Sequence, residues 1–124
     1  MSAKILVIED NPSNRLLVKD ILEFRGYLVI EAENGKEGIM AAGEHLPDLI
    51  FMDLQMPVMN GFEACRRIKD DPRTRHLKIV ALTSFAMKGE QEKVMASGFD
   101  GYIPKPIDTR ELPLKVEKFL EKGV

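Results

Sequence analysis

The sequence predicts an α/β fold in which five parallel strands form one sheet and helices cover both of its faces. Short apolar runs alternate about five times with amphipathic segments that end at capping or helix-breaking residues. This alternation is typical of strand–helix–strand units with right-handed crossovers. The 124 residues suit one compact domain, so we expect a single domain over residues 1–124 and no second domain.

The apolar runs define the expected strands. The first run, ILVIED, is continuous and rich in β-branched residues, as expected of a strand buried on both faces. If the sheet is of the flavodoxin-like three-layer kind, with strand order 2-1-3-4-5, then the first, third, fourth and fifth strands are consecutive neighbours. The expected strands are Ile5–Asp10, Tyr27–Ala32, Leu49–Met52, Leu77–Leu82 and Gly101–Pro104.

Capping residues and helix breakers define the expected helices. Asn11 followed by Pro12 is typical of an N-cap and a first helical residue, and Asn–x–x–Glu pairs precede two further helices. The fourth helix has few apolar anchors. Pro113 falls inside the first turns of the last helix, where its missing N–H is unfavourable. The helices are expected from Pro12 until Gly26, from the Asn34 cap to about Glu44, from the Asn60 cap to Asp71, over Lys88–Ser97, and from the Asp108 cap to about Leu120.

Composition excludes several classes of protein. A net charge of -2 argues against a general nucleic-acid binder, and the absence of Trp argues against a base-stacking surface. No stretch approaches the ~20 apolar residues of a membrane span, and the N-terminus does not resemble a secretory signal. The single Cys65 cannot form an intrachain disulfide, which favours a reducing compartment. We therefore expect a cytoplasmic protein.

Polar residues follow four of the five expected strands. Glu9 and Asp10 end the first, Asp53 follows the third, Thr83 follows the fourth and Lys105 follows the fifth. Ligands of open parallel sheets bind at the carboxyl ends of the strands. With the order 2-1-3-4-5, these groups are expected to lie together at one edge of the sheet.

The chemistry of this set indicates phosphoryl transfer. Three clustered carboxylates repel one another and require a cation, and oxygen ligands favour Mg²⁺, Mn²⁺ or Ca²⁺ over zinc. The Thr83 hydroxyl and the Lys105 ammonium can contact phosphoryl oxygens. A carboxylate nucleophile, a divalent cation, a hydroxyl and an ammonium group together meet the needs of phosphoryl transfer to an aspartate. Asp53 is the central acid and the expected nucleophile.

Four segments carry a resemblance to a known family. The segments ILVIEDN, DLIFMDLQMPVMNG, IVALTS and GYIPKPI resemble the signatures of receiver domains of two-component response regulators, in matching order and spacing across essentially the whole chain. The resemblance implies that Asp53 is the phosphoacceptor, that Asp10 binds Mg²⁺ directly, and that Glu9 binds it through water. It also implies that the backbone carbonyl of Gln55 completes the metal shell.

The resemblance further implies a conformational switch. Thr83 matches the switch hydroxyl that follows the phosphoryl group, Lys105 matches the cation that contacts it, and Tyr102 matches the aromatic residue that turns inward. Pro57 and Gly61 match the turn after the acceptor. The surface that changes is expected to comprise the fourth helix, the fifth strand and the last helix, with candidate contacts at Phe85, Ala86, Met87, Pro106 and Ile107.

The resemblance also implies partners. The phosphodonor would be a phosphohistidine on a sensor histidine kinase or a histidine phosphotransfer protein, and a further protein would be the target. Such a domain is a signalling domain that promotes its own phosphorylation and dephosphorylation. The chain is most similar to stand-alone receivers and to the receivers of hybrid kinases. Donor docking is expected at Pro12, Asn14, Arg15 and Val18.

Alternative functions remain open. The chain could be a receiver fragment of a larger hybrid kinase or response regulator, or an adaptor that acts without phosphorylation. An aspartyl-phosphate hydrolase typically has a second Asp where Gln55 stands, and no glycine-rich nucleotide motif is present. His45 and His76 are expected at the surface or in loops, and Cys65 in the core.

Overall fold

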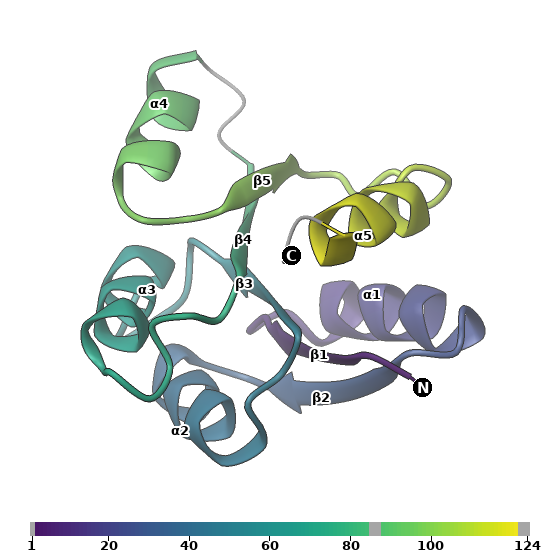
Figure 1. The fold of residues 1–124 in the computed structure, drawn as a ribbon. Helices are drawn as coiled ribbons and strands as arrows, with labels where there is room; N and C mark the ends of the chain where they lie inside the picture. Colours follow the sequence, from purple (N-terminus) through teal and green to yellow (C-terminus); the bar gives the residue numbers. More distant parts are fainter. Residues whose placement is uncertain (1, 85–87, 122–124) are drawn as a thin grey trace.

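The computed structural model of the chain describes residues 2–84 and 88–121. It contains a five-stranded parallel sheet of order β2-β1-β3-β4-β5, which confirms the predicted topology. Figure 1 shows α1 and α5 on one face of the sheet and α2, α3 and α4 on the other. The strands are β1 (Lys4–Ile8), β2 (Leu28–Ala32), β3 (Leu49–Asp53), β4 (Ile79–Thr83) and β5 (Gly101–Pro104). The helices are α1 (Pro12–Phe24), α2 (Gly35–His45), α3 (Gly61–Asp70), α4 (Lys88–Ala96) and α5 (Leu112–Glu121).

Two apolar cores lie on opposite faces of the sheet. Successive strand residues alternate between them: Ile50 contributes to the core beneath α2 and α3, and Phe51 contributes to the core beneath α1 and α5. Every residue of β3 and β4 is buried, because these strands have neighbours on both edges and helices on both faces. The central strands therefore provide a rigid support for the groups at their carboxyl ends.

Three asparagines begin helices as predicted. The Oδ1 atoms of Asn11, Asn34 and Asn60 accept hydrogen bonds from the N–H groups three residues later, at 2.9–3.0 Å. Each bond satisfies an N–H group that has no partner inside its helix. These caps fix where the chain turns from the carboxyl edge of the sheet into α1, α2 and α3.

The last helix begins later than predicted. Asp108 Oδ1 accepts hydrogen bonds from the N–H groups of Arg110 and Glu111, which closes a turn before the helix starts at Leu112. Pro113 is thus the second residue of α5, where the N–H group has no intrahelical partner and its absence costs little. The predicted conflict at Pro113 came from placing the helix start too early.

The first strand is shorter than predicted, because it ends at Ile8 rather than at Asp10. The third and fourth strands extend one residue further than predicted, to Asp53 and Thr83. None of the helices in the described part of the chain has the length and apolar character needed to span a bilayer.

Candidate functional site

The polar groups predicted to meet at the sheet edge do converge. The Lys105 ammonium lies 2.8 Å from Glu9 Oε1 and 3.2 Å from Asp53 Oδ1. Carboxylate oxygens of Glu9, Asp10 and Asp53 lie within 4.8 Å of one another. Glu9 and Asp53 are buried, with relative exposures of 0% and 4%. Three strands of the sheet thus bring two buried carboxylates and one cation into direct contact.

Backbone hydrogen bonds between neighbouring strands hold these residues at the edge of the sheet. The Glu9 N–H donates to Ala32 O at 3.1 Å, one step beyond the end of β1. The Lys105 N–H donates to Thr83 O at 2.7 Å, one step beyond β5. Each functional residue is therefore the last residue of its strand or follows it closely. Thr83 is 2% exposed and ends β4 beside them.

The buried carboxylates have unequal pKa values. Burial raises the pKa of Asp53 to about 7, assisted by the adjacent Glu9 carboxyl, although the Gln55 N–H and the Lys105 ammonium oppose the shift. Burial also acts to raise the pKa of Glu9, but its contacts with Asp53, Lys105 and the Asn11 N–H outweigh it and lower that pKa. The pKa of Lys105 is raised, because its two carboxylate contacts outweigh its burial. Near neutral pH Glu9 and Lys105 are therefore charged, whereas Asp53, with a pKa of about 7, is close to half protonated.

The donor set fits a hard divalent cation. Glu9 Oε1 is buried, and among the described residues its contact is the ion pair with the Lys105 ammonium at 2.8 Å. Glu9, Asp10 and Asp53 offer oxygen ligands alone, which suit Mg²⁺ or Mn²⁺. The Gln55 N–H donates to Asp53 Oδ1 at 3.1 Å, so Gln55 directly adjoins this cluster. The direct role of its carbonyl stays a prediction.

The raised pKa of Asp53 predicts a pH-dependent stability. A carboxyl group with a higher pKa in the folded than in the unfolded chain binds its proton more tightly when folded, so its contribution to stability is lost as pH rises toward about 7. Between pH 5 and pH 8 the metal-free protein is expected to lose about 2 kcal/mol of unfolding free energy through this group. Urea unfolding in a chelator measures this change.

Asp53→Asn provides the control for this pH dependence, because the amide does not titrate. The variant is expected to lack most of the loss and to exceed the wild type in stability at pH 8. Equal pH slopes for the two proteins would contradict the assignment of the raised pKa to Asp53.

The predicted donor-docking residues do not all reach the surface. Val18 has an exposed fraction of 0% and lies with Leu22 on the face of α1 that packs against the sheet, so its assignment to a docking surface was wrong. Residues 18 and 22 face the sheet because they lie one helical turn apart, whereas Leu17, at 38% exposure, faces outward. Phe24, near the end of the same helix, is 89% exposed.

Arg15 is also largely withdrawn from the surface. Its side chain is 14% exposed and is occupied by contacts to Glu31, Glu33 and the Glu9 carbonyl. A docking role for its guanidinium group stays a prediction, and the structure shows this group engaged in contacts within the chain. No feature of the sequence predicts these contacts of Arg15 with Glu9, Glu31 and Glu33.

One residue of the predicted donor surface lies beside two residues of the predicted switching surface. Asn14, from the predicted donor surface, lies with Pro106 and Ile107, from the predicted switching surface, in a groove of about 380 Å³. Leu17, Ser84 and Lys105 complete its lining, so the groove reaches the site itself. Pro12 is exposed, whereas Phe85, Ala86 and Met87 lie outside the described residues.

The predicted switch residue Tyr102 lies in β5, and the predicted loop residues Pro57 and Gly61 follow Asp53 in the chain. Tyr102 is half-buried, packs against the core beneath α2 and α3, and pairs with Ala81 of β4. Pro57 is exposed, and the N–H of Gly61 donates to Leu54 O at 3.0 Å, which closes the loop after Asp53.

His76 is exposed, His45 is half-buried in the last turn of α2, and Cys65 is buried.

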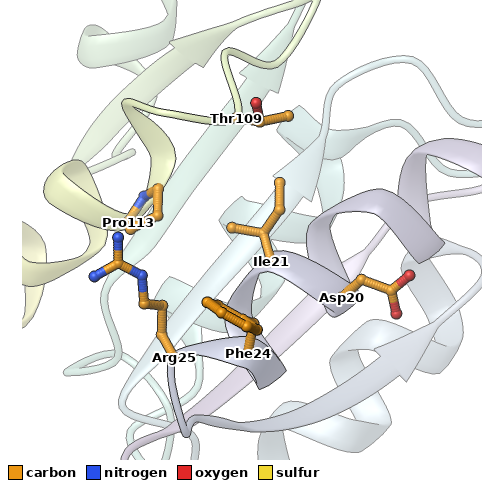
Figure 2. Close-up of a pocket in the computed structure, with 6 residues that line it drawn as sticks. All are labelled: Asp20, Ile21, Phe24, Arg25, Thr109 and Pro113. Atoms are coloured by element: carbon orange, nitrogen blue, oxygen red, sulfur yellow. The ribbon is translucent and has the colours of Figure 1, made fainter.

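A second groove, of about 410 Å³, runs between α1 and the start of α5 (Figure 2). Ile21, Phe24 and Pro113 supply apolar surface, and Asp20 and Arg25 lie at opposite sides of Phe24. None of its lining residues belongs to the carboxylate cluster, so the groove is separate from that site.

Known proteins are similar to this chain in sequence and in fold. The family model for the response regulator receiver domain matches residues 5–117. The polar-differentiation response regulator DivK of Brucella anthropi is 39% identical over 97% of this chain and 98% of its own length. Among solved structures, the receiver domain of the sensor histidine kinase PA1611 of Pseudomonas aeruginosa is 30% identical with a TM-score of 0.89, covering 98% of this chain and 99% of that one.

The chemotaxis protein CheY4 of Vibrio cholerae is also similar, with 28% identity and a TM-score of 0.89 over 96% of this chain and 99% of that one. The family match and the DivK similarity cover nearly the whole chain in sequence, and these two structures cover it in fold. The chain therefore belongs to the response regulator receiver domain family.

Proposed function

We propose that Asp53 accepts a phosphoryl group from a phosphohistidine. An Asp53 carboxylate oxygen attacks phosphorus, the P–N bond breaks, and the departing imidazole keeps the electron pair and takes up a proton. The direct contact of Lys105 with both Glu9 and Asp53 is the observation that carries this proposal. This ammonium can follow the negative charge from the carboxylate to the phosphoryl oxygens.

Mg²⁺ is the proposed cofactor, with Mn²⁺ as a possible substitute. Asp10, Asp53 and the Gln55 carbonyl would bind it directly, and Glu9 would bind it through water. The cation would neutralise the carboxylates and polarise the phosphoryl group. The similar PA1611 receiver domain has a magnesium ion coordinated in its active-site cleft, which supports this choice.

Phosphorylation would then change the surface formed by α4, β5 and α5. The Thr83 hydroxyl would turn toward the phosphoryl oxygens, and the half-buried Tyr102 would move inward. Val94 is the buried apolar residue of α4, with an exposed fraction of 1%, so few contacts oppose a shift of this helix. The same groups would later assist hydrolysis of the acyl phosphate.

Sensor histidine kinases and histidine phosphotransfer proteins are the proposed donors, acting in the cytoplasm. The groove lined by Asn14, Pro106 and Ile107 opens onto the site and could receive a donor helix. The similarity to DivK over almost its full length favours a single-domain regulator that acts on other proteins. A receiver within a larger hybrid kinase is the second candidate, favoured by the similarity to the PA1611 receiver domain.

Mass spectrometry of the intact protein tests the proposal. The wild type is incubated with acetyl phosphate and Mg²⁺ and is expected to gain one phosphoryl group that hydroxylamine removes. Asp53→Asn is expected to gain none. Asp70→Asn makes the same change of charge at an exposed helical position and is expected to react like the wild type. Equal phosphorylation of Asp53→Asn would defeat the assignment, and an unreactive wild type would favour the adaptor alternative.

A further inference from the structure

Arg15 joins the start of α1 to the carboxyl ends of β1 and β2. Its Nη1 donates to the Glu9 carbonyl at 2.8 Å, and its Nε donates to Glu31 Oε1 at 3.2 Å. Its Nη2 lies 3.7 Å from Glu33 Oε1. The side chain is 14% exposed, so the guanidinium group is enclosed by these contacts. All its nitrogen atoms are therefore directed at groups beside the proposed metal site.

Both backbone polar groups of Glu9 make hydrogen bonds. The N–H of Glu9 donates to Ala32 O at 3.1 Å, and its carbonyl accepts from Arg15. Both sides of the residue are thus held by different elements. The Glu9 carbonyl belongs to the peptide that links Glu9 to Asp10, so its orientation sets the directions in which these two carboxylates leave the chain.

We propose that Arg15 is a positioning residue for the divalent cation. It holds the Glu9–Asp10 peptide so that the two carboxylates meet Asp53, and Glu31 and Glu33 hold the guanidinium group in turn. The proposal rests on the proposed function, because it concerns the same metal site. Residues that orient metal ligands commonly change metal affinity by about 10–100-fold when they are replaced.

The positive charge of Arg15 and its positioning contacts have opposite effects on Mg²⁺ affinity, so replacing Arg15 distinguishes between them. Arg15 carries a positive charge close to a site for a cation, so its charge alone weakens cation binding. If charge were its main influence, Arg15→Met would bind Mg²⁺ more tightly. If positioning dominates, the same variant binds Mg²⁺ more weakly in spite of the lost repulsion.

Titration calorimetry with Mg²⁺ on the unphosphorylated full chain separates these cases. Arg15→Met is expected to bind Mg²⁺ about 10-fold more weakly than the wild type. Arg15→Lys retains the charge but cannot reproduce the fork of N–H donors, so it is expected to bind several-fold more weakly as well. Lys19→Met removes a cation of the same helix that pairs with Glu23, and it is expected to leave the affinity within about two-fold.

A double-mutant cycle tests whether Glu31 acts through Arg15. Glu31→Gln is expected to weaken Mg²⁺ binding in the wild type and to have little effect in Arg15→Met. The measurements are made at high ionic strength, which screens the direct influence of the exposed Glu31 charge. An equal effect in both backgrounds would overturn this part of the proposal.

Urea unfolding of each metal-free variant confirms that it is folded at the titration temperature. Equal or tighter binding by Arg15→Met would overturn the proposal, as would equal weakening by Lys19→Met. If Arg15→Met does not fold, wild-type affinity in Arg15→Lys would overturn it. A wild type that binds no Mg²⁺ would instead refute the proposed function and is distinguishable from these outcomes.

Discussion

Lys105→Ala is expected to destabilise the metal-free protein at pH 8 by roughly 2–4 kcal/mol. The ammonium contacts Glu9 at 2.8 Å and Asp53 at 3.2 Å, and its side chain is 16% exposed. Its removal leaves two buried carboxylates in contact without a cation. The loss therefore exceeds that of an ordinary surface ion pair, which contributes about 0–1 kcal/mol.

The same variant is expected to regain stability as the pH falls. The pKa of Asp53 is already raised to about 7, and loss of the neighbouring ammonium raises it further. The folded variant then takes up a proton that the unfolded chain does not bind until much lower pH. Its deficit relative to the wild type is thus largest above pH 7 and shrinks toward pH 5.

Urea unfolding at pH 5.5 and pH 8 in a chelator measures this difference. Lys115→Ala is the matched control, because Lys115 is a half-exposed lysine of α5 that pairs with Glu111 one turn away. It is expected to cost about 0.5 kcal/mol or less at both pH values. A deficit of Lys105→Ala that is the same at both pH values would indicate lost packing instead of uncompensated charge.

Phosphoryl uptake by Lys105→Ala is also expected to fall, by about 100-fold or more. Removal of one group that stabilises the transition-state charge commonly has an effect of this size. Intact-mass measurements over time with acetyl phosphate and Mg²⁺ provide the rate. Retention of the wild-type rate would exclude a role of this ammonium in the transfer, even if the stability prediction holds.

The convergence of Asp53 and Lys105 could be predicted because topology alone determines it. Alternating runs indicate a parallel sheet, and the carboxyl ends of parallel strands meet at one edge. The strand order then makes β1, β3, β4 and β5 consecutive neighbours. Errors of one or two residues in strand ends, as at Ile8, do not move a side chain away from that edge.

The docking surface could not be predicted at the level of single residues. Leu17 and Val18 are adjacent and apolar, and about 100° of helical rotation separates an exposed from a buried side chain. The sequence does not determine which of these two residues faces inward, because that depends on how α1 packs against the sheet and beside α5. Arg15 presents the same difficulty, since its partners Glu31 and Glu33 come from β2 and the following loop.

Gly61→Ala is expected to be the most disruptive of three glycine substitutions, with a cost of roughly 3 kcal/mol or more. A Cβ at Gly61 would lie 2.5 Å from Asp53 O and 2.8 Å from Leu54 Cα. Both atoms belong to the backbone that delivers Asp53 to the site, so neither can move without displacing the strand end. The variant is therefore also expected to bind Mg²⁺ and to accept a phosphoryl group poorly.

Two glycines of α2 are the controls, because they differ from Gly61 in what a Cβ would contact. At Gly38 a Cβ would lie 2.4 Å from Cδ1, 2.8 Å from Cγ1 and 3.1 Å from Cγ2 of Ile8, so this buried side chain must shift. No backbone atom is among these contacts, so Gly38→Ala is expected to cost about 1–2 kcal/mol, less than Gly61→Ala. At Gly43 nothing lies within 4 Å, and Gly43→Ala is expected to stabilise the helix by about 0.5–1 kcal/mol. Urea unfolding should therefore rank Gly43→Ala above the wild type, then Gly38→Ala, then Gly61→Ala. A Gly61→Ala protein as stable as Gly38→Ala would mean that the loop after Asp53 yields as easily as a side chain, and the rigid support inferred for the acceptor would be wrong.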